Sequence, residues 1–270
     1  MLQAKVKIAY NKKAGDGYFH LRFLSPKIAK YARPGQFLNI RVNESYEPLL
    51  RRPLSIHKIK GDTVEIFYAV VGEATGILSQ RKPGEYLGVI GPLGNGFDYK
   101  AGTPSILVAG GMGVAPLVFL AEKLAYSKTL SLPVRQAGAK RYPLNAIVLI
   151  GAKTKSRILC ENEFKRLGCE VKIATDDGSK GFKGYVSELL NVTLSVNGYP
   201  LPAIYACGPK LMLKEISRVC HKYSIPAQVS LEEHMACGIG ACLGCVVNTT
   251  EGFKRVCKEG PVFSGDEIIF

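Results

Sequence analysis

Four cysteines near the end of the chain have a spacing that suits metal binding. They follow the pattern Cys237-x4-Cys242-x2-Cys245-x11-Cys257. A C-x4-C-x2-C run with a fourth cysteine further along is typical of plant-type [2Fe–2S] sites, in which thiolates hold the irons. Glycines interspersed among these cysteines permit positive φ and let main-chain N–H groups approach the sulfurs. The spacing therefore predicts that the four cysteines are ligands of an iron–sulfur cluster.

Other roles for these four cysteines stay open from the spacing alone. Structural zinc favours paired C-x2-C knuckles, and only Cys242 and Cys245 have that spacing. Free cysteines also pack in cores as small apolar side chains, and this is our interpretation of Cys160, Cys169 and Cys220. Disulfides are disfavoured, because the N-terminus has no signal-like apolar segment and a cytoplasmic chain keeps its thiols reduced.

Two segments in the N-terminal part could bind a flavin nucleotide. Arg52-Pro53-Leu54-Ser55 combines a forked cationic donor with a hydroxyl, which could contact a phosphate and a flavin edge. Ala69-Val70-Val71 and Ala74-Thr75 lie on a predicted strand-to-helix turn, where small residues would admit a pyrophosphate. Taken alone, the first segment would more commonly be a solvated surface arginine and the second an ordinary strand-to-helix turn.

Two segments in the middle of the chain could bind a nicotinamide nucleotide. Gly111 and Gly113 follow a predicted buried strand and open a predicted helix, whose N-terminus favours anions. Cys207 and Gly208 follow a later predicted strand and should lie at the carboxyl edge of the same sheet. The Cys207 thiol could contact a nicotinamide ring or be a packed core cysteine. These residues do not distinguish NAD from NADP.

The elements that must position these residues fall into three stretches. Residues 1–100 hold short alternating segments separated by Gly and Pro turns, which predicts a β-rich domain, a barrel or a sandwich. Residues 101–225 alternate strands with helices, which predicts an α/β nucleotide-binding domain with a parallel sheet covered on both faces. Residues 226–270 hold the four spaced cysteines and form a small C-terminal iron–sulfur domain in this interpretation.

Hydrophobic periodicity predicts the individual elements. In the first stretch it predicts strands over residues 5–9, 18–23, 37–42, 54–59 and 63–71. In the second stretch it predicts strands over residues 105–109, 146–151, 171–175 and 203–206. It predicts helices there over residues 114–125, 161–167, 186–190 and 210–223. Residues 126–143 lack clear periodicity and are interpreted as a surface insertion.

The charge balance is strongly basic, with 36 Lys and Arg against 22 Asp and Glu and a formal net charge of +14. The basic residues occur in short groups such as Lys12-Lys13 and Arg51-Arg52, without interleaved aromatic residues. Nucleic-acid binding is therefore not favoured, whereas a positive field suits anionic cofactors. The chain also lacks an apolar run long enough to predict a membrane span.

The motifs occur in an order that resembles the ferredoxin–NADP reductase superfamily. The resemblance rests on Pro34-Gly35-Gln36-Phe37, Arg52-Pro53-Leu54-Ser55, Gly111-Met112-Gly113-Val114-Ala115-Pro116 and Cys207-Gly208-Pro209. The end of the chain resembles, more specifically, the electron-transfer subunits of B-type dihydroorotate dehydrogenases. That resemblance rests on residues 231–242 and on Val256-Cys257-Lys258-Glu259-Gly260-Pro261-Val262-Phe263.

The resemblance implies an FAD-binding barrel in residues 1–100, an NAD-binding domain in 101–225 and a [2Fe–2S] domain in 226–270. It implies that Arg52 to Ser55, Ala69 to Val71, Ala74 and Thr75 contact FAD. It also implies a cytoplasmic heterotetramer with an FMN-containing catalytic subunit that oxidises dihydroorotate in pyrimidine (UMP) biosynthesis. Electrons would pass through the cluster and FAD to NAD⁺, so no side chain is expected to act as a catalytic acid or base.

Two alternatives remain beside this hypothesis. One is the flavin and iron–sulfur subunit of a ferredoxin- or hydrogenase-linked NAD(P)H oxidoreductase. The other is a non-enzymatic, zinc-dependent interaction protein. Iron and acid-labile sulfide analysis separates the second alternative from the other two interpretations.

Overall fold

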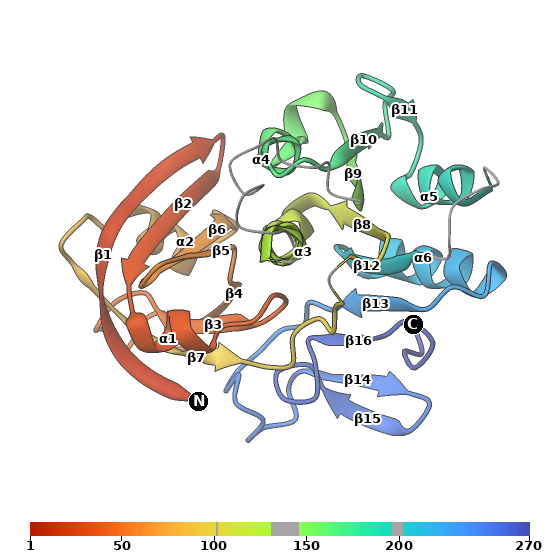
Figure 1. The fold of residues 1–270 in the computed structure, drawn as a ribbon. Helices are drawn as coiled ribbons and strands as arrows, with labels where there is room; N and C mark the ends of the chain where they lie inside the picture. Colours follow the sequence, from red (N-terminus) through yellow and green to blue (C-terminus); the bar gives the residue numbers. More distant parts are fainter. Residues whose placement is uncertain (101, 131–145, 196–201) are drawn as a thin grey trace. The chain divides into compact units, whose positions relative to one another are not determined.

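The computed structural model describes residues 1–100, 102–130, 146–195 and 202–270. These residues form two compact units (Figure 1). Unit 1 comprises Met1–Gly96 and Glu233–Val262, and unit 2 comprises Phe97–Glu232 and Phe263–Phe270. Most of the predicted insertion, residues 131–143, lies outside the described residues.

Unit 1 is built on an antiparallel sheet of seven strands in the order β4-β3-β7-β1-β2-β6-β5. Its strands are β1 (Leu2–Gly15), β2 (Tyr18–Leu24), β3 (Phe37–Arg41), β4 (Arg52–Ser55), β5 (Lys58–Lys60), β6 (Thr63–Ala69) and β7 (Tyr86–Leu93). Although β4 begins this order and β6 stands near its end, β4 contacts β6. The sheet therefore curls into a half-barrel, so of the barrel and the sandwich that the alternating pattern leaves open, the barrel is the form found.

The side chains of the half-barrel alternate between core and surface, as a strand with one buried face requires. Along β7, Leu87, Val89, Gly91 and Leu93 are buried while Gly88, Ile90 and Pro92 are more exposed. Two short helices, α1 (Pro26–Tyr31) and α2 (Glu73–Gln80), connect strands of this unit. The hairpin of β14 (Val246–Thr249) and β15 (Gly252–Arg255) forms a separate small sheet in unit 1.

The sequence predictions for unit 1 need corrections. The expected strand over residues 54–59 is wrong, because β4 ends at Ser55 and β5 begins at Lys58. Ile56 and His57 between them are fully buried, so the chain turns inward there instead of continuing an alternating strand. Strand β7 and helix α1 have no counterpart in the sequence prediction.

Unit 2 contains a sheet in the order β11-β10-β9-β8-β12-β13-β16. Its strands are β8 (Ser105–Gly110), β9 (Ala146–Ala152), β10 (Glu170–Thr175), β11 (Phe182–Lys183), β12 (Ala203–Cys207), β13 (Ala227–Ser230) and β16 (Val262–Ser264). The pairings from β11 through β13 are all parallel. Every residue of β8 is buried, as expected for a strand covered on both faces.

Helices cover both faces of this sheet, as the alternating pattern predicts (Figure 1). The helices are α3 (Val114–Leu130), α4 (Glu161–Arg166), α5 (Val186–Ser195) and α6 (Lys210–Lys222). Helix α3 packs with α4, and α5 packs with α6. Within the described residues, no helix is long and apolar enough to cross a membrane.

Candidate cofactor sites

The four predicted cluster ligands lie on two neighbouring loops of unit 1. Cys237, Cys242 and Cys245 precede β14, and Cys257 lies two residues after the end of β15. The β14–β15 hairpin folds the chain back, and the Val256 N–H donates to the Cys245 carbonyl at 2.9 Å. The structure therefore brings the fourth cysteine of the motif back to the other three.

Main-chain N–H groups point at two of these sulfurs. The Cys237 sulfur accepts N–H groups from Cys242 at 3.3 Å and from Ile239 at 3.5 Å. The Cys257 sulfur accepts the N–H of Gly240 at 3.1 Å. Gly240 has a φ of 82°, a conformation that glycine adopts at little cost. Gly240 thus has the role that the sequence predicts for it.

The electrostatics of the sulfurs suit a bound cation. Partial burial raises the pKa of the Cys237 thiol, but the N–H groups of Cys242 and Ile239 outweigh it and lower the pKa to about 6. Burial and the neighbouring Cys245 sulfur raise the pKa of Cys257 to about 12. Closely grouped sulfurs that repel one another when ionised, with N–H donors aimed at them, are a donor set that fits an iron–sulfur cluster.

The residues predicted to contact a flavin also come together in unit 1. Arg52, Pro53, Leu54 and Ser55 form β4, where all four are partly exposed. The second segment begins at the end of β6 with Ala69 and continues through Val70 and Val71 to helix α2. Since β4 and β6 are in contact, the two segments belong to one region of the half-barrel.

The turn between β6 and α2 is held by Thr75. Its hydroxyl oxygen accepts the N–H of Val71 at 2.9 Å and of Gly72 at 3.2 Å, and the hydroxyl donates to the Gly72 carbonyl at 3.0 Å. Thr75 and Ala74 are buried, whereas the Val71 side chain is 84% exposed. The predicted strand-to-helix turn is therefore confirmed, and Thr75 is the residue that shapes it.

The residues predicted to contact a nicotinamide nucleotide meet at one edge of the unit 2 sheet. Gly111 and Gly113 follow β8, while Cys207 ends the neighbouring parallel strand β12 and pairs with Ala109. A Cβ on Gly113 would lie 2.0 Å from the Cys207 carbonyl oxygen, so only glycine fits there. A Cβ on Gly208 would likewise lie only 3.1 Å from the Gly110 Cα. The carboxyl ends of parallel strands are where open α/β sheets bind ligands.

Cys207 itself is a buried, protonated thiol. Its side chain is 1% exposed. Burial raises its pKa well above the ordinary value, and the nearby Glu232 carboxylate adds to this effect. A neutral thiol is compatible with both interpretations of Cys207, as a packed core residue and as a neighbour of a neutral ring.

Comparison with known proteins identifies the family. Residues 232–269 match the family model described as the iron-sulfur cluster binding domain of dihydroorotate dehydrogenase B, and residues 107–218 match the oxidoreductase NAD-binding domain. The electron transfer subunit of dihydroorotate dehydrogenase B (NAD(+)) from Desulforamulus reducens is 41% identical, over 100% of this chain and 98% of that protein. The corresponding subunit from Clostridium acetobutylicum is 38% identical, over 97% and 96%. This chain belongs to the family of dihydroorotate dehydrogenase B electron transfer subunits.

As a family member, the chain is an oxidoreductase subunit with iron–sulfur and NAD-binding domains, and the predicted family is confirmed. A solved NADH-dependent reduced ferredoxin-NADP oxidoreductase superposes with a TM-score of 0.80 and 30% identity, over 98% of this chain and 90% of that one. A Neisseria gonorrhoeae ferredoxin NADP⁺ reductase, with bound FAD and NADP, shares the fold at a TM-score of 0.63 and 17% identity, over 82% and 91%.

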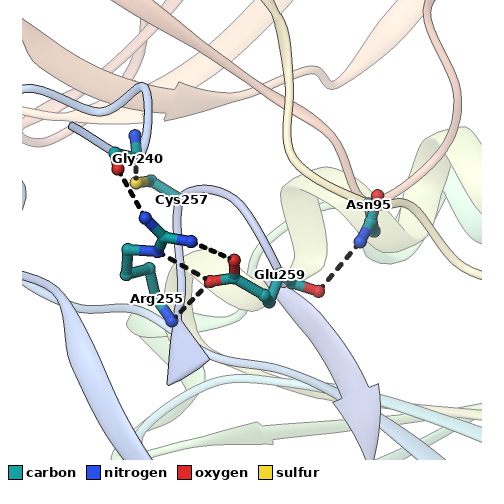
Figure 2. Close-up of polar contacts among 5 residues, drawn as sticks. All are labelled: Asn95, Gly240, Arg255, Cys257 and Glu259. Atoms are coloured by element: carbon teal, nitrogen blue, oxygen red, sulfur yellow. Dashed lines mark hydrogen bonds and ion pairs between the residues drawn. The ribbon is translucent and has the colours of Figure 1, made fainter. Parts of the chain in front are cut away.

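Two contacts of the electron transfer subunit were not predicted from its sequence. Asn39 on β3 donates from its side-chain amide to the Cys237 carbonyl at 3.0 Å. Arg255 and Glu259 form an ion pair beside Cys257 and Gly240 (Figure 2). Asn39 carries no sequence signal, because nothing local marks a strand residue that contacts a loop 198 positions away. The spacing of Arg255 and Glu259 resembles an ordinary surface ion pair.

Proposed function

We propose that this electron transfer subunit binds a [2Fe–2S] cluster, FAD and NAD in the three stretches that the sequence defines. The proposed cluster domain is 226–270, with Cys237, Cys242, Cys245 and Cys257 as ligands. The proposed flavin-binding barrel is 1–100, with FAD bound by Arg52, Pro53, Leu54, Ser55, Ala69, Val70, Val71, Ala74 and Thr75. The proposed NAD domain is 101–225, with contacts from Gly111, Gly113, Cys207 and Gly208.

The observation that carries this proposal is the set of N–H groups directed at the cysteine sulfurs. The donors on Cys242, Ile239 and Gly240 act on two different cysteines of the motif, Cys237 and Cys257. Directed N–H donors tune iron–sulfur clusters, and a core of packed cysteines has no need of them. The match of residues 232–269 to an iron–sulfur binding domain supports the same assignment.

The cofactors define the reaction that the chain serves. We infer that its partner is an FMN-containing catalytic subunit, in a cytoplasmic heterotetramer with two copies of each subunit. Electrons released by dihydroorotate oxidation in that partner would cross the cluster and FAD and reach NAD⁺ as hydride. The residues of this chain hold the cofactors and set their electrostatic surroundings, and none of them is assigned a proton-transfer role.

Reconstitution tests this function. The purified chain should carry about two iron and about two sulfide per chain, and it should pass electrons from NADH to an artificial acceptor. It should form NADH from dihydroorotate and NAD⁺ only after the cognate catalytic subunit is added. Zinc in place of iron would overturn the cluster assignment. Failure with the cognate partner, together with activity toward reduced ferredoxin, would favour a ferredoxin-linked oxidoreductase, which the similarity to the solved NADH-dependent enzyme makes the second candidate.

A further inference from the structure

One arginine connects the hairpin of unit 1 to the loop that carries the cysteines. The guanidinium of Arg255 donates from Nη1 to the Gly240 carbonyl at 2.7 Å. Its other edge faces the Glu259 carboxylate, with Nε donating to Oε2 at 3.0 Å and Nη2 donating to Oε1 at 2.5 Å (Figure 2). Such a two-point contact fixes the plane of the guanidinium as well as its position.

The residue that Arg255 holds also contacts a proposed cluster ligand. Gly240 offers its carbonyl to Arg255 and its N–H to the Cys257 sulfur, at 3.1 Å (Figure 2). Both groups lie on the same glycine, which adopts a positive φ and, having no Cβ, rotates its main chain more freely than other residues unless something fixes it. The contact with Arg255 therefore constrains the direction of the N–H that points at sulfur.

Glu259 is fixed in turn by contacts on its other sides. Its carboxylate accepts the Arg255 main-chain N–H at 2.8 Å. Its carbonyl accepts the Asn95 side-chain amide at 2.9 Å, and the Asn95 N–H donates to the Gly260 carbonyl at 2.5 Å. The side chains of Arg255 and Glu259 are only 26% and 31% exposed. The pair is thus partly shielded from solvent. A charge in such a place acts more strongly on its neighbours than a charge in bulk water does.

We propose that Arg255 is a positioning residue that directs the Gly240 N–H at Cys257, and that the opposed charges of Arg255 and Glu259 set the reduction potential of the bound cluster. The proposal rests on the ligand assignment made above. Reduction adds one electron to the cluster, and the added negative charge is stabilised by N–H donors to sulfur and by nearby cations. Arg255 favours the reduced form by holding the Gly240 N–H toward sulfur and by its own positive charge. The Glu259 carboxylate offsets part of that charge.

A purely structural ion pair makes a different prediction. If the pair only closed the turn after β15, removing either member would loosen the loop, and both variants would change in the same direction. An electrostatic role predicts opposite signs. Arg255→Gln leaves a carboxylate unpaired beside the cluster and should lower its midpoint potential. Glu259→Gln leaves a cation unpaired there and should raise it.

The test uses the full chain with its cofactors and follows the reduced cluster by electron paramagnetic resonance during a redox titration. Arg255→Lys keeps the charge and loses the fork, so its potential should lie between those of the wild type and Arg255→Gln. Lys254→Gln is the matched control. Lys254 neighbours Arg255 on β15, pairs with Glu251 at 2.8 Å, and points to the other side of the strand. This control should shift the potential less than Arg255→Gln does.

Iron content and potential separate this proposal from the ligand assignment. A wild-type chain without iron would refute the assignment of the four cysteines as cluster ligands. It would not bear on the contact between Arg255 and Glu259. If Arg255→Gln loses its cluster, the other two variants still test the proposal. The midpoint potential should rise in Glu259→Gln and fall in Arg255→Lys. Unchanged potentials in loaded variants, or shifts of the same sign in Arg255→Gln and Glu259→Gln, would overturn the proposal.

Discussion

The side-chain amide of Asn39 donates a hydrogen bond to the main-chain carbonyl of Cys237, with an N···O distance of 3.0 Å. Asn39 is 1% exposed and lies on β3, where it pairs with Pro53 of the proposed flavin segment. A Cβ on the next residue, Gly238, would lie 2.4 Å from the Asn39 amide nitrogen, so the approach requires glycine. One buried side chain therefore connects the strand beside the proposed flavin segment with the first proposed cluster ligand.

Replacing Asn39 with Ala should loosen this connection. The substitution leaves the Cys237 carbonyl without its donor, which costs about 1–3 kcal/mol in the free energy of unfolding. We expect a lower melting temperature and less iron per chain after gel filtration. Asn43→Ala is the matched control, since the Asn43 amide donates to the Glu47 carbonyl in an exposed loop. Equal iron loss in both variants would show that Asn39 has no special connection with the cluster.

Replacing Cys242 with Ser should remove the cluster. A serine hydroxyl is a poor substitute for a thiolate ligand, because thiolates are the ligands that hold these irons. The electron paramagnetic resonance signal of the reduced chain should disappear, while flavin absorption persists. Cys160→Ser is the control, because Cys160 lies on unit 2 outside the proposed ligand set. An unchanged signal in Cys242→Ser contradicts the ligand assignment.

Arg52 should matter for flavin binding and much less for the cluster. Arg52→Ala removes a charge-assisted donor, worth about 1.5–3 kcal/mol, which corresponds to roughly ten- to hundredfold in affinity. The ratio of FAD to protein after gel filtration should fall while the iron content stays. Arg218→Ala provides the control, because Arg218 is 73% exposed on α6 and pairs with Glu215. If both variants retain FAD equally, Arg52 is an ordinary surface residue.

Gly113 should tolerate no side chain. The added Cβ of Gly113→Ala would collide with the Cys207 carbonyl, and overpacking of this kind costs about 1–3 kcal/mol. Because the clash separates β12 from the loop after β8, NADH affinity should fall together with stability. Gly76→Ala in helix α2 is the comparison, since its Cβ meets nothing within 4 Å. That variant should be as stable as the wild type or gain up to about 1 kcal/mol.

The sequence is informative wherever chemistry and periodicity are local. The cysteine spacing, the glycine turn after β8 and the position of Cys207 at the end of β12 all follow from runs of neighbouring residues, and the structure brings the predicted residues together. Strand β7 escaped prediction because Gly88, Gly91 and Pro92 lie within it, and such residues usually indicate turns. The contacts of Asn39 and of Asn95 depend on which distant loop meets which strand, and no local pattern encodes that.

The acid stability of unit 1 should depend on Glu65. Its carboxylate is nearly buried, 4% exposed, and pairs with His20 at 2.7 Å and with Arg22. Burial alone would raise its pKa, but hydrogen bonds from His20 and Arg22 outweigh this effect and lower the pKa from 4.5 to about 2. A group whose pKa is lowered by folding stabilises the fold fully at pH values above its pKa in the unfolded chain. This stabilisation is lost as the pH falls from about 4.5 toward 2.

Glu65→Gln measures that contribution directly. At pH 7 the variant should lose on the order of 3 kcal/mol in the free energy of unfolding, because it cannot pair with Arg22 as a carboxylate does. The difference from the wild type should shrink as the pH falls below about 4.5, when the wild-type carboxyl becomes protonated in the unfolded chain. Urea unfolding at several pH values measures this difference, or gap, in the free energy of unfolding between wild type and variant. Glu44→Gln, at an exposed partner of Lys5, should show a much smaller gap at every pH. A gap for Glu65→Gln that stays constant with pH would mean that packing, and not charge, is what Glu65 contributes.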